Sequence, residues 1–575
     1  MIKIKNNEQL EIEGLESWHG ILSEKKLKIL KKSWAETFRT FILPSIPVDK
    51  VAKLYSKSMG RPTKELNSIV GAVILQEFFD LTDEETVSNM ALNQQWHYAL
   101  NCFEDSDQVI SLKTLWTMRT QIANSELYNE IFSISTDEII SRLGINVSMQ
   151  RLDSVHVHSN MARLGRIRIM VRTLKVFLKN LKKRFPIVFE DKIDSTIIDR
   201  YLKKDSESLF SRIKPSERKR SLQNIGEDIC SIISLFSTKE KICRMKTYKT
   251  LLRVFNEHFN IDDNNDVIAK KPKDVSSDSI QNPSDPDAGY DGHKGQGYHT
   301  QIMESYRNDE DRASEEESGI DIITHVNTEP ANEHDSNALI PAIDDVKSRG
   351  LDCETVLADA AYGGTDKIEK AKEKDVELVS PTLGRHSERQ HESFNYNSET
   401  YCVNACPNGK KSDEIKHNKK GSITAVWYEQ TCAGCKIDNC PAKVKKRGKG
   451  YRYHYYTISS VKCHLRRQYE NSQEFRDIYR FRSGIEATNS RFISMTGARR
   501  SRYRGLNKMR FSQKLKALAI NVFRVTGYMR KLGDFRYILS FYAQYFQKYC
   551  FFKPETVIFM HLDQNEFCFR INDVS

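Results

Sequence analysis

Two hydrophobic periodicities divide this chain of 575 residues. Apolar residues recur every three or four positions across 58–144, with LNSIVGAVILQEFF (66–79) as the clearest example, and again across 165–260, which predicts helices in both stretches. Strand-like patterns occur in QRLDSVHVHSN (150–160), GYHTQIMES (297–305), IDIITHVNT (320–328), TVLAD (355–359) and VELVSP (376–381). The pattern therefore predicts a helical N-terminal part that is followed by a mixed α/β part.

Local signals predict where several of these elements begin or end. Capping-box pairs, which predict helix starts, occur at Thr82 with Glu85 and at Ser135 with Glu138. Thr365 is predicted to cap a helix after TVLAD, and Asp359 then stands at the end of a strand, where open α/β sheets present functional groups. Consecutive helices in the N-terminal part could form a helix-turn-helix reader of DNA, although most helix pairs bind nothing.

The positive charge of the chain is concentrated in one segment. The net charge is +12, but residues 441–516 alone contain 21 Lys and Arg against 4 Asp and Glu, a local charge of +17 that leaves −5 (12 minus 17) for the rest. This density is typical of a polyanion-binding surface, because phosphates attract the cations and release counterions on binding. A solvated basic face is the alternative, and nucleic acid is the favoured partner.

Composition also bears on location and on metal binding. No run approaches the roughly 20 apolar residues that span a bilayer, and MIKIKNNEQLEIEG lacks the apolar core of a signal peptide, so a cytoplasmic protein without a membrane partner is expected. In that reducing compartment a Cys cluster indicates metal rather than disulfides. Candidate ligands of a structural, tetrahedral Zn²⁺ are Cys406, Cys432, Cys435 and Cys440. Cys402 could replace Cys406, and four free cysteines are the alternative.

Three carboxylates stand out by their setting. Asp153 lies in the middle of a strand, Asp359 at a strand end, and Glu486 in the arginine-rich stretch YRFRSGIEATNSRF. On a helix Arg482 and Glu486 would be neighbours, and an ordinary exposed ion pair is the alternative interpretation of that pair. Hydrolysis and transesterification of phosphodiesters use carboxylate oxygens to hold Mg²⁺, and two such ions about 4 Å apart can serve the attacking and leaving oxygens. Acids among arginines therefore favour phosphodiester chemistry.

The stretches around these acids resemble a known family. LDSVHVHSN, VLADAAYGG and YRFRSGIEATNSRF, in this order, resemble the three acidic motifs of the DDE transposases of bacterial insertion sequences. Residues 60–101, DPDAGY (285–290), HVNTEPANEHD (325–335) and ARRSRYRGLNKMR are similar to further parts of that group, so the resemblance spans roughly residues 58–530.

The resemblance implies an enzyme that cuts DNA and joins the freed ends to a target with divalent metal. Asp153, Asp359 and Glu486 would be the catalytic triad and would hold two Mg²⁺ or Mn²⁺ ions. The partners would be double-stranded DNA, as element ends and as target, and further copies of the chain in a homo-oligomer on DNA. Expected DNA-binding residues are Tyr479, Arg482, Arg491, Arg499, Arg500, Arg502 and Arg504.

One position departs from the family pattern. The motif that contains Glu486 continues to a Lys that contacts DNA phosphate in the family, but this chain has Ile493 there. Either Arg491 or Arg499 replaces that phosphate contact, or the contact is absent. Arg491 does not lie on the Glu486 face of a helix.

The predicted fold class is α+β or α/β, with an all-helical N-terminal domain and a ribonuclease-H-like mixed-sheet core that carries two insertions. The predicted parts are the helical domain (1–145), the first parts of the core (146–164 and 285–400), a helical insertion with a polar linker (165–284), a Cys-rich insertion (401–463), the Glu486 helix with the basic end of the core (464–530) and an aromatic extension (531–575). Two alternatives to a transposase stay open: a nuclease with the same core that cuts without joining, and a non-catalytic DNA-binding regulator derived from a transposase. Ile493 favours the regulator, whereas the three acids argue against it.

Overall fold

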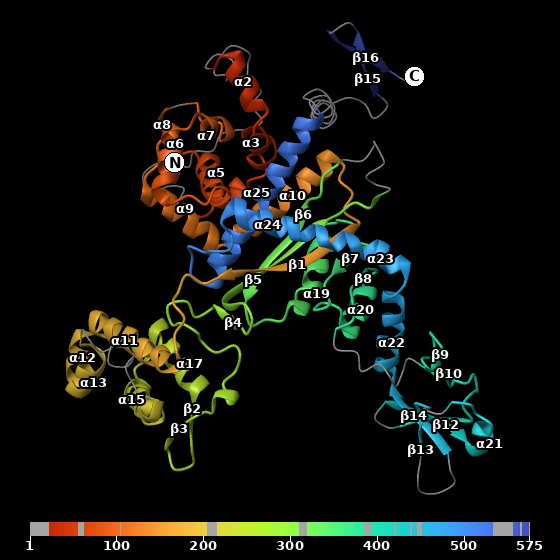
Figure 1. Cartoon of the computed structure of the whole chain (residues 1–575). Helices are drawn as coiled ribbons and strands as arrows, with labels where there is room; N and C mark the ends of the chain where they lie inside the picture. Colours follow the sequence, from red (N-terminus) through yellow and green to blue (C-terminus); the bar gives the residue numbers. More distant parts are fainter. Residues whose placement is uncertain are drawn as a thin grey trace.

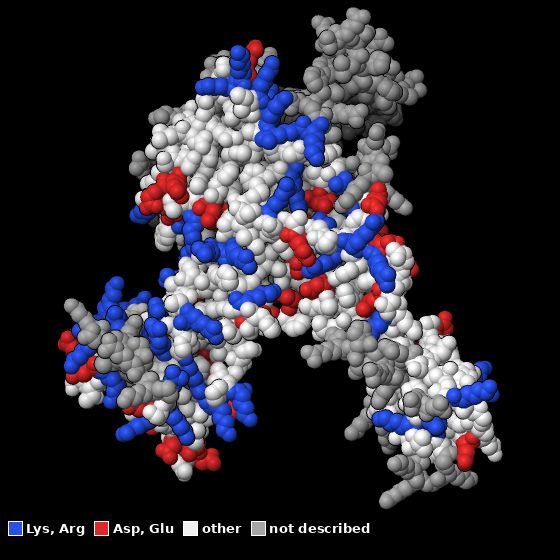
Figure 2. Space-filling view, viewed as in Figure 1, with Lys and Arg blue, Asp and Glu red and all other residues white. Residues whose placement is uncertain are grey.

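In the computed structural model, a central α/β core is flanked by a helical part, and two lobes project from the core on either side of an open arch (Figures 1 and 2). None of the helices that the structure describes is long and apolar enough to cross a membrane. The described residues are 22–55, 63–103, 105–203, 215–309, 319–383, 393–418, 421–437, 440–444, 451–532, 556–563 and 566–573.

The core is built on one mixed sheet. Its strands are β1 (Met149–His158), β4 (Gly289–Asp291), β5 (Gly295–Ser305), β6 (Ile323–Pro330), β7 (Thr355–Ala358) and β8 (Glu377–Val379). The order is β6-β5-β1-β7-β8, and β4 pairs with the start of β5. β1 is antiparallel to β5 but parallel to β7, and β7 is parallel to β8. This order with these directions is that of a ribonuclease-H-like core, so the predicted fold class is confirmed.

Side chains alternate along β1, so successive residues lie on opposite faces of the sheet. Leu152 packs under α19 (Leu339–Ser348) and α20 (Thr365–Lys372), whereas Val155 packs toward α25 (Leu506–Leu532) on the opposite face. Asp153 is two residues from Val155, so their side chains lie on the same face of the sheet. Asp153 therefore belongs to the α25 face, which is also the face that α24 (Gly484–Thr496) covers.

The N-terminal part is helical, as the periodicity predicts. Its helices are α2 (Glu24–Lys31), α3 (Trp34–Thr37), the π-helix η1 (Phe38–Ile42), α4 (Val48–Ala52), α5 (Leu66–Phe78), α6 (Asp83–Leu92), α7 (Gln94–Ala99), α8 (Asp105–Gln108), α9 (Leu112–Asn124) and α10 (Leu127–Leu143). All 13 residues of α5 are buried, because this helix is apolar on nearly every side and is surrounded by its neighbours. The helices pack around α25 and share one hydrophobic core with the sheet.

One of the two predicted capping boxes is confirmed and the other is wrong. Thr82 and Glu85 form the predicted reciprocal bonds at the start of α6. Ser135, in contrast, is buried in the interior of α10. The first turn of α6 carries three acids, which DNA phosphates would repel, and α5 is wholly buried. These two features disfavour α5 and α6 as a helix-turn-helix reader.

Two insertions form the lobes, and each has its own hydrophobic core. The first contains α11 (Arg166–Arg184), α12 (Pro186–Lys192), α13 (Ser195–Tyr201), η2 (Pro215–Glu217), α15 (Arg218–Phe236), α16 (Glu240–Cys243), α17 (Lys246–His258), β2 (Phe259–Ile261), β3 (Val267–Ala269) and η3 (Pro272–Asp274). The second contains β9 (Asn395–Tyr396), β10 (Val403–Ala405), β11 (Glu414–His417), β12 (Ser422–Tyr428), α21 (Glu429–Cys432), β13 (Lys443–Val444) and β14 (Tyr451–Thr457). The stretch predicted as a polar linker thus contains β3, which pairs with β2 as a hairpin.

The chain returns to the core through α22 (Ile458–Glu470), α23 (Gln473–Tyr479), the 3₁₀ turn η6 (Arg480–Ser483), α24 and α25. Thr365 is the first residue of α20 and Gly364 is its N-cap, so the predicted Thr365 cap is wrong by one position. A hairpin of β15 (Thr556–Asp563) and β16 (Glu566–Asp573) ends the described chain. The aromatic stretch 535–552 lies outside the described residues.

Candidate active site

Two of the three predicted acids lie on neighbouring strands. Leu152 of β1 pairs with Ala358 at the end of the parallel strand β7, and Asp153 and Asp359 are the next residues. Parallel strands lie about 4.8 Å apart, and residues at matching positions face the same side of a sheet. The backbone therefore brings the two carboxylates together at the carboxyl end of β7. The carboxylate of Asp359 accepts a hydrogen bond of 2.8 Å from the Ala361 N–H, which fixes its direction.

The environment of Asp153 is mostly buried and negatively charged. Its side chain is only 15% exposed. Burial raises the pKa of Asp153, the Arg482 guanidinium opposes this rise, and the carboxylates of Asp359 and Asp335 add to it. A buried site that carries excess negative charge stabilises a bound cation.

Glu486 reaches the site from a broken helix. The stretch 479–492, which was considered above at helical spacing, comprises the end of α23, the 3₁₀ turn η6 and the first part of α24. Glu486 lies in the first turn of α24, and its side chain is 66% exposed. The predicted neighbour contact is present, since Arg482 Nη1 lies 2.8 Å from Glu486 Oε1.

Arg482 also contacts Asp153, with 3.2 Å between Arg482 Nη2 and Asp153 Oδ2. Its guanidinium thus lies between two of the predicted acids and offsets part of their negative charge. Asn489 of α24 donates a hydrogen bond of 3.0 Å to the same Asp153 oxygen. These contacts connect α24 to β1, although Asp153 and Asn489 are 336 positions apart in the sequence.

Asp335 is a fourth carboxylate at this edge of the sheet, and it is not among the three acids that the sequence motifs predict. It opens the 3₁₀ turn η4 (Asp335–Asn337), which follows β6. Its carboxylate accepts hydrogen bonds from Ser154 Oγ at 3.2 Å and from Gln301 Nε2 at 2.8 Å. Burial would raise the pKa of Asp335, but its contacts with His299 and Gln301 lower it to about 2. The signal in the sequence is its place at the end of HVNTEPANEHD.

Two buried histidines lie beside these acids. His156 of β1 pairs with His299 of β5, and their ring centroids are 5.3 Å apart. Burial, together with the neighbouring His299, lowers the pKa of His156 to about 4, so His156 is neutral near pH 7. Among the residues that the structure describes, no group of three or more His, Cys, Asp or Glu side chains is arranged to hold a metal ion. The Glu486 carboxylate is paired with Arg482.

Four of the predicted DNA-binding arginines, Arg499, Arg500, Arg502 and Arg504, lie on one loop next to β1. Within 499–504, the Arg499 carbonyl accepts a hydrogen bond of 2.9 Å from the His158 N–H at the end of β1. Arg499, Arg500 and Arg504 are exposed. Arg502 is exposed as well, but it forms an ion pair of 2.6 Å with Asp80, which neutralises part of its charge.

The remaining motif positions have different surroundings. Tyr479 is half-buried and stacks on Phe475, with 5.2 Å between ring centroids. Ile493, which stands where the family has Lys, is partly buried and packs against the core shared by the N-terminal helices and the sheet. Packing therefore accounts for an apolar residue at this position. Arg491 and Arg499 are both exposed.

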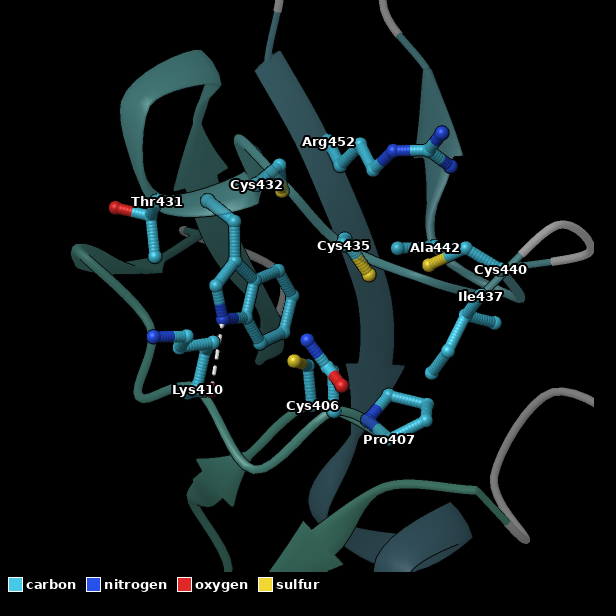
Figure 3. A pocket seen from close by; sticks show the side chains of 12 residues that line it. Cys406, Pro407, Lys410, Thr431, Cys432, Cys435, Ile437, Cys440, Ala442 and Arg452 are labelled. Atoms are coloured by element: carbon cyan, nitrogen blue, oxygen red, sulfur yellow. Dashed lines mark hydrogen bonds between the residues drawn. The ribbon is translucent and has the colours of Figure 1, made fainter.

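The four predicted zinc ligands line one cavity in the second lobe. Cys406, Cys432, Cys435 and Cys440 surround a space of about 100 Å³, together with Trp427 and Arg452 (Figure 3). Burial raises the pKa of the Cys432 thiol, and the other three cysteines add to this rise against the effect of Arg452. Cys402 does not line the cavity, which favours Cys406. The four thiols are gathered, but they are not in the arrangement of a metal site.

Comparison with known proteins gives two family matches. Residues 405–526 match the family described as a transposase DDE domain, and residues 26–121 match the one described as a transposase domain (DUF772). No curated protein matches the chain. The first match contains Glu486, the four cysteines and the basic loop, whereas Asp153, Asp359 and the helical insertion lie outside both matches.

Proposed function

We propose that this chain, a DDE transposase by its two transposase domains, cuts DNA at the ends of an insertion sequence and joins the freed 3′ ends to target DNA. The observation that supports this proposal is the placement of Asp153 on β1 beside Asp359, the first residue after the paired strand β7. Glu486 reaches the same edge on α24, and Arg482 links it to Asp153. The basic loop 499–504 begins at the end of β1 and supplies cations for the DNA backbone.

The donor set fits divalent metal, which DDE transposases generally use. The Arg482 guanidinium already bridges Asp153 and Glu486, so a cation is accommodated between these two acids. We assign Mg²⁺ or Mn²⁺ to Asp153, Asp359 and Glu486, with Arg482 released to a DNA phosphate. Divalent ions held there supply Lewis-acid activation of the attacking oxygen and stabilisation of the leaving oxygen.

The protein's own residues position the reaction. Asn489 fixes one oxygen of Asp153, and Ala361 fixes the carboxylate of Asp359. Guanidinium groups bind phosphates through paired, charge-assisted hydrogen bonds, so Arg482 and the exposed arginines of the basic loop would orient the DNA strand. Holding the reacting groups in place and neutralising charge are the main contributions that phosphoryl transfer requires.

Joining of the freed DNA end to a target distinguishes a transposase from a nuclease that only cuts. The test supplies the chain with a duplex that carries a pre-cut element end, a labelled target and Mg²⁺. We expect covalently joined products when the end has a 3′-hydroxyl and none when it has a 3′-deoxy terminus. Cutting of uncut ends without any joined product would instead favour the nuclease.

We also propose that the cysteine cavity binds one structural Zn²⁺ through Cys406, Cys432, Cys435 and Cys440. The convergence of all four cysteines on one cavity supports this assignment, and a closed four-thiolate site would be structural. Binding would require the thiols to rearrange from their positions in the structure.

The zinc assignment predicts about one zinc per chain in the purified wild type and loss of that zinc in Cys432→Ser. Because structural zinc contributes directly to folding, the second lobe of that variant should become sensitive to limited proteolysis. Cys463→Ser, in α22 and outside the cavity, is the matched control and should retain the metal. A wild type without zinc, or a Cys432→Ser variant that retains it, would refute the assignment.

A further inference from the structure

The first helix of the helical insertion carries positive charge without any negative charge. Between 163 and 184 the sequence contains nine Lys and Arg and no Asp or Glu. Five of these cations follow one another at intervals of four and three residues: Arg168, Arg172, Lys175, Lys179 and Lys182. This spacing places them along one face of α11, and we call them the α11 stripe. Arg168 and Lys182 are 14 positions apart, which corresponds to about 21 Å along the helix.

The α11 stripe faces solvent because the opposite face of the helix is occupied. Ile169, Leu174 and Phe177 are buried in the core of the insertion. Arg168, Lys179 and Lys182 are exposed, and Arg172 is half-buried. Within the described part of the chain, no acid forms an ion pair with any of these four cations. Like charges at this spacing destabilise a helix, so the stripe has no evident role in the stability of the free protein.

The segment that leads into the α11 stripe contacts the basic loop of the candidate active site. Arg504 Nε donates to Asn160 Oδ1 at 3.3 Å, and Asn160 Nδ2 donates to the Arg502 carbonyl at 3.3 Å. Asn160 lies in the short segment that connects β1 to α11. In that segment Arg163 lies 4.8 Å above the Tyr290 ring of β4. Lys and Arg side chains cover much of this lobe and the adjoining part of the core in Figure 2.

We propose that the α11 stripe binds the phosphate backbone of the DNA duplex that enters the candidate active site, as an extension of the basic loop. This inference rests on the proposed function. A duplex is favoured over a membrane surface, because a helix that lies on a membrane needs a free apolar face and that of α11 is buried. The stripe spans the length of about six base pairs. Because it would contact phosphates and no base edges, we expect the binding to be independent of DNA sequence.

The test measures how tightly the full chain binds a random-sequence duplex of about 40 base pairs at a series of salt concentrations. The stripe variant combines Arg168→Gln, Arg172→Gln, Lys179→Gln and Lys182→Gln. The control variant removes four exposed cations elsewhere in the insertion: Lys219→Gln, Lys239→Gln, Lys241→Gln and Lys246→Gln. Both variants lose the same charge, so an effect of net charge alone would be equal in the two.

We expect the stripe variant to bind about 10- to 100-fold more weakly near 0.15 M salt, with a salt slope that is smaller by about 0.9 for each lost phosphate contact. The control should stay within about two-fold of the wild type. Equal binding by the two variants, with circular dichroism showing both folded, would overturn the inference.

Cleavage separates this inference from the proposed function. At saturating protein the stripe variant should still cut DNA, because its substitutions lie outside the acidic site. If the stripe and control variants bind DNA equally well, and the wild type cuts DNA in a Glu486-dependent way, only the inference about the stripe is overturned. If the stripe variant binds weakly and the wild type never cuts, the DNA-binding role of the stripe is supported and the proposed function is overturned.

Discussion

Glu486→Gln is expected to abolish DNA cleavage by the full chain while its affinity for duplex DNA stays within about two-fold of the wild type. The amide keeps the shape of the side chain but removes the negative charge that a metal ligand needs. A loss of about 4 kcal/mol of transition-state stabilisation corresponds to roughly a 1,000-fold slower reaction. Binding should persist, because the cations of the basic loop and Arg482 are unchanged.

Glu474→Gln is the matched control for this substitution. Glu474 is exposed and lies in the first turn of α23, just as Glu486 lies in the first turn of α24. Its replacement should leave cleavage within about two-fold, since it has no place in the acidic site. Normal cutting by Glu486→Gln would show that the Arg482–Glu486 contact is an ordinary surface ion pair.

Glu304→Ala is expected to lower the free energy of unfolding by about 3–5 kcal/mol, because it leaves buried positive charge without a partner. Glu304 lies on β5 and is completely buried. Its carboxylate lies 2.7 Å from Arg151 Nε of β1 and 2.8 Å from Arg524 Nη1 of α25. It also accepts a hydrogen bond of 2.7 Å from Thr488, two residues after Glu486 on α24. The same substitution should therefore loosen the helix that carries Glu486.

Urea unfolding at pH 7 measures this effect, with Glu369→Ala as the control. Glu369 pairs with Lys462 at the surface and is 49% exposed, so its loss should cost less than about 1 kcal/mol. A Glu304→Ala variant as stable as this control would contradict the account.

The pH dependence of unfolding gives a second measurement of the Glu304 network. Burial alone would raise the pKa of Glu304, but Arg524 and Arg151 lower this pKa below its ordinary value of 4.5. A lowered pKa in the folded state means that this stabilisation is complete above the ordinary pKa and is lost as the pH falls through the folded pKa. The wild type should therefore lose more stability than Glu304→Ala when the pH falls below about 4.5.

Local patterns predicted much of the fold, because hydrophobic alternation and helical spacing are local properties. The five predicted strands are present as β1, β5, β6, β7 and β8, and the family matches confirm the resemblance to DDE transposases. The Ser135 prediction was wrong because a Ser followed three residues later by Glu also occurs inside a helix. Here the apolar spacing runs without a break through α10.

Most contacts of the candidate site depend on strand register and could not be predicted. Asp335 approaches Asp153 only because β6 pairs with β5 and β5 with β1. The position of Arg482 between two acids depends on η6, which interrupts the expected helix. The cysteines are different: their spacing predicted a shared site, and they do line one cavity.

Cleavage of a duplex that contains the DNA flanking this reading frame tests whether the chain is a metal-dependent transposase. The full chain is incubated with it in Mg²⁺, in Mn²⁺ and in excess chelator. We expect cuts at defined ends that leave 3′-hydroxyls in either metal and no cuts in chelator. Cutting that survives the chelator, or steeply salt-dependent binding with no cutting in any condition, would contradict this expectation, and the second result would favour a non-catalytic regulator.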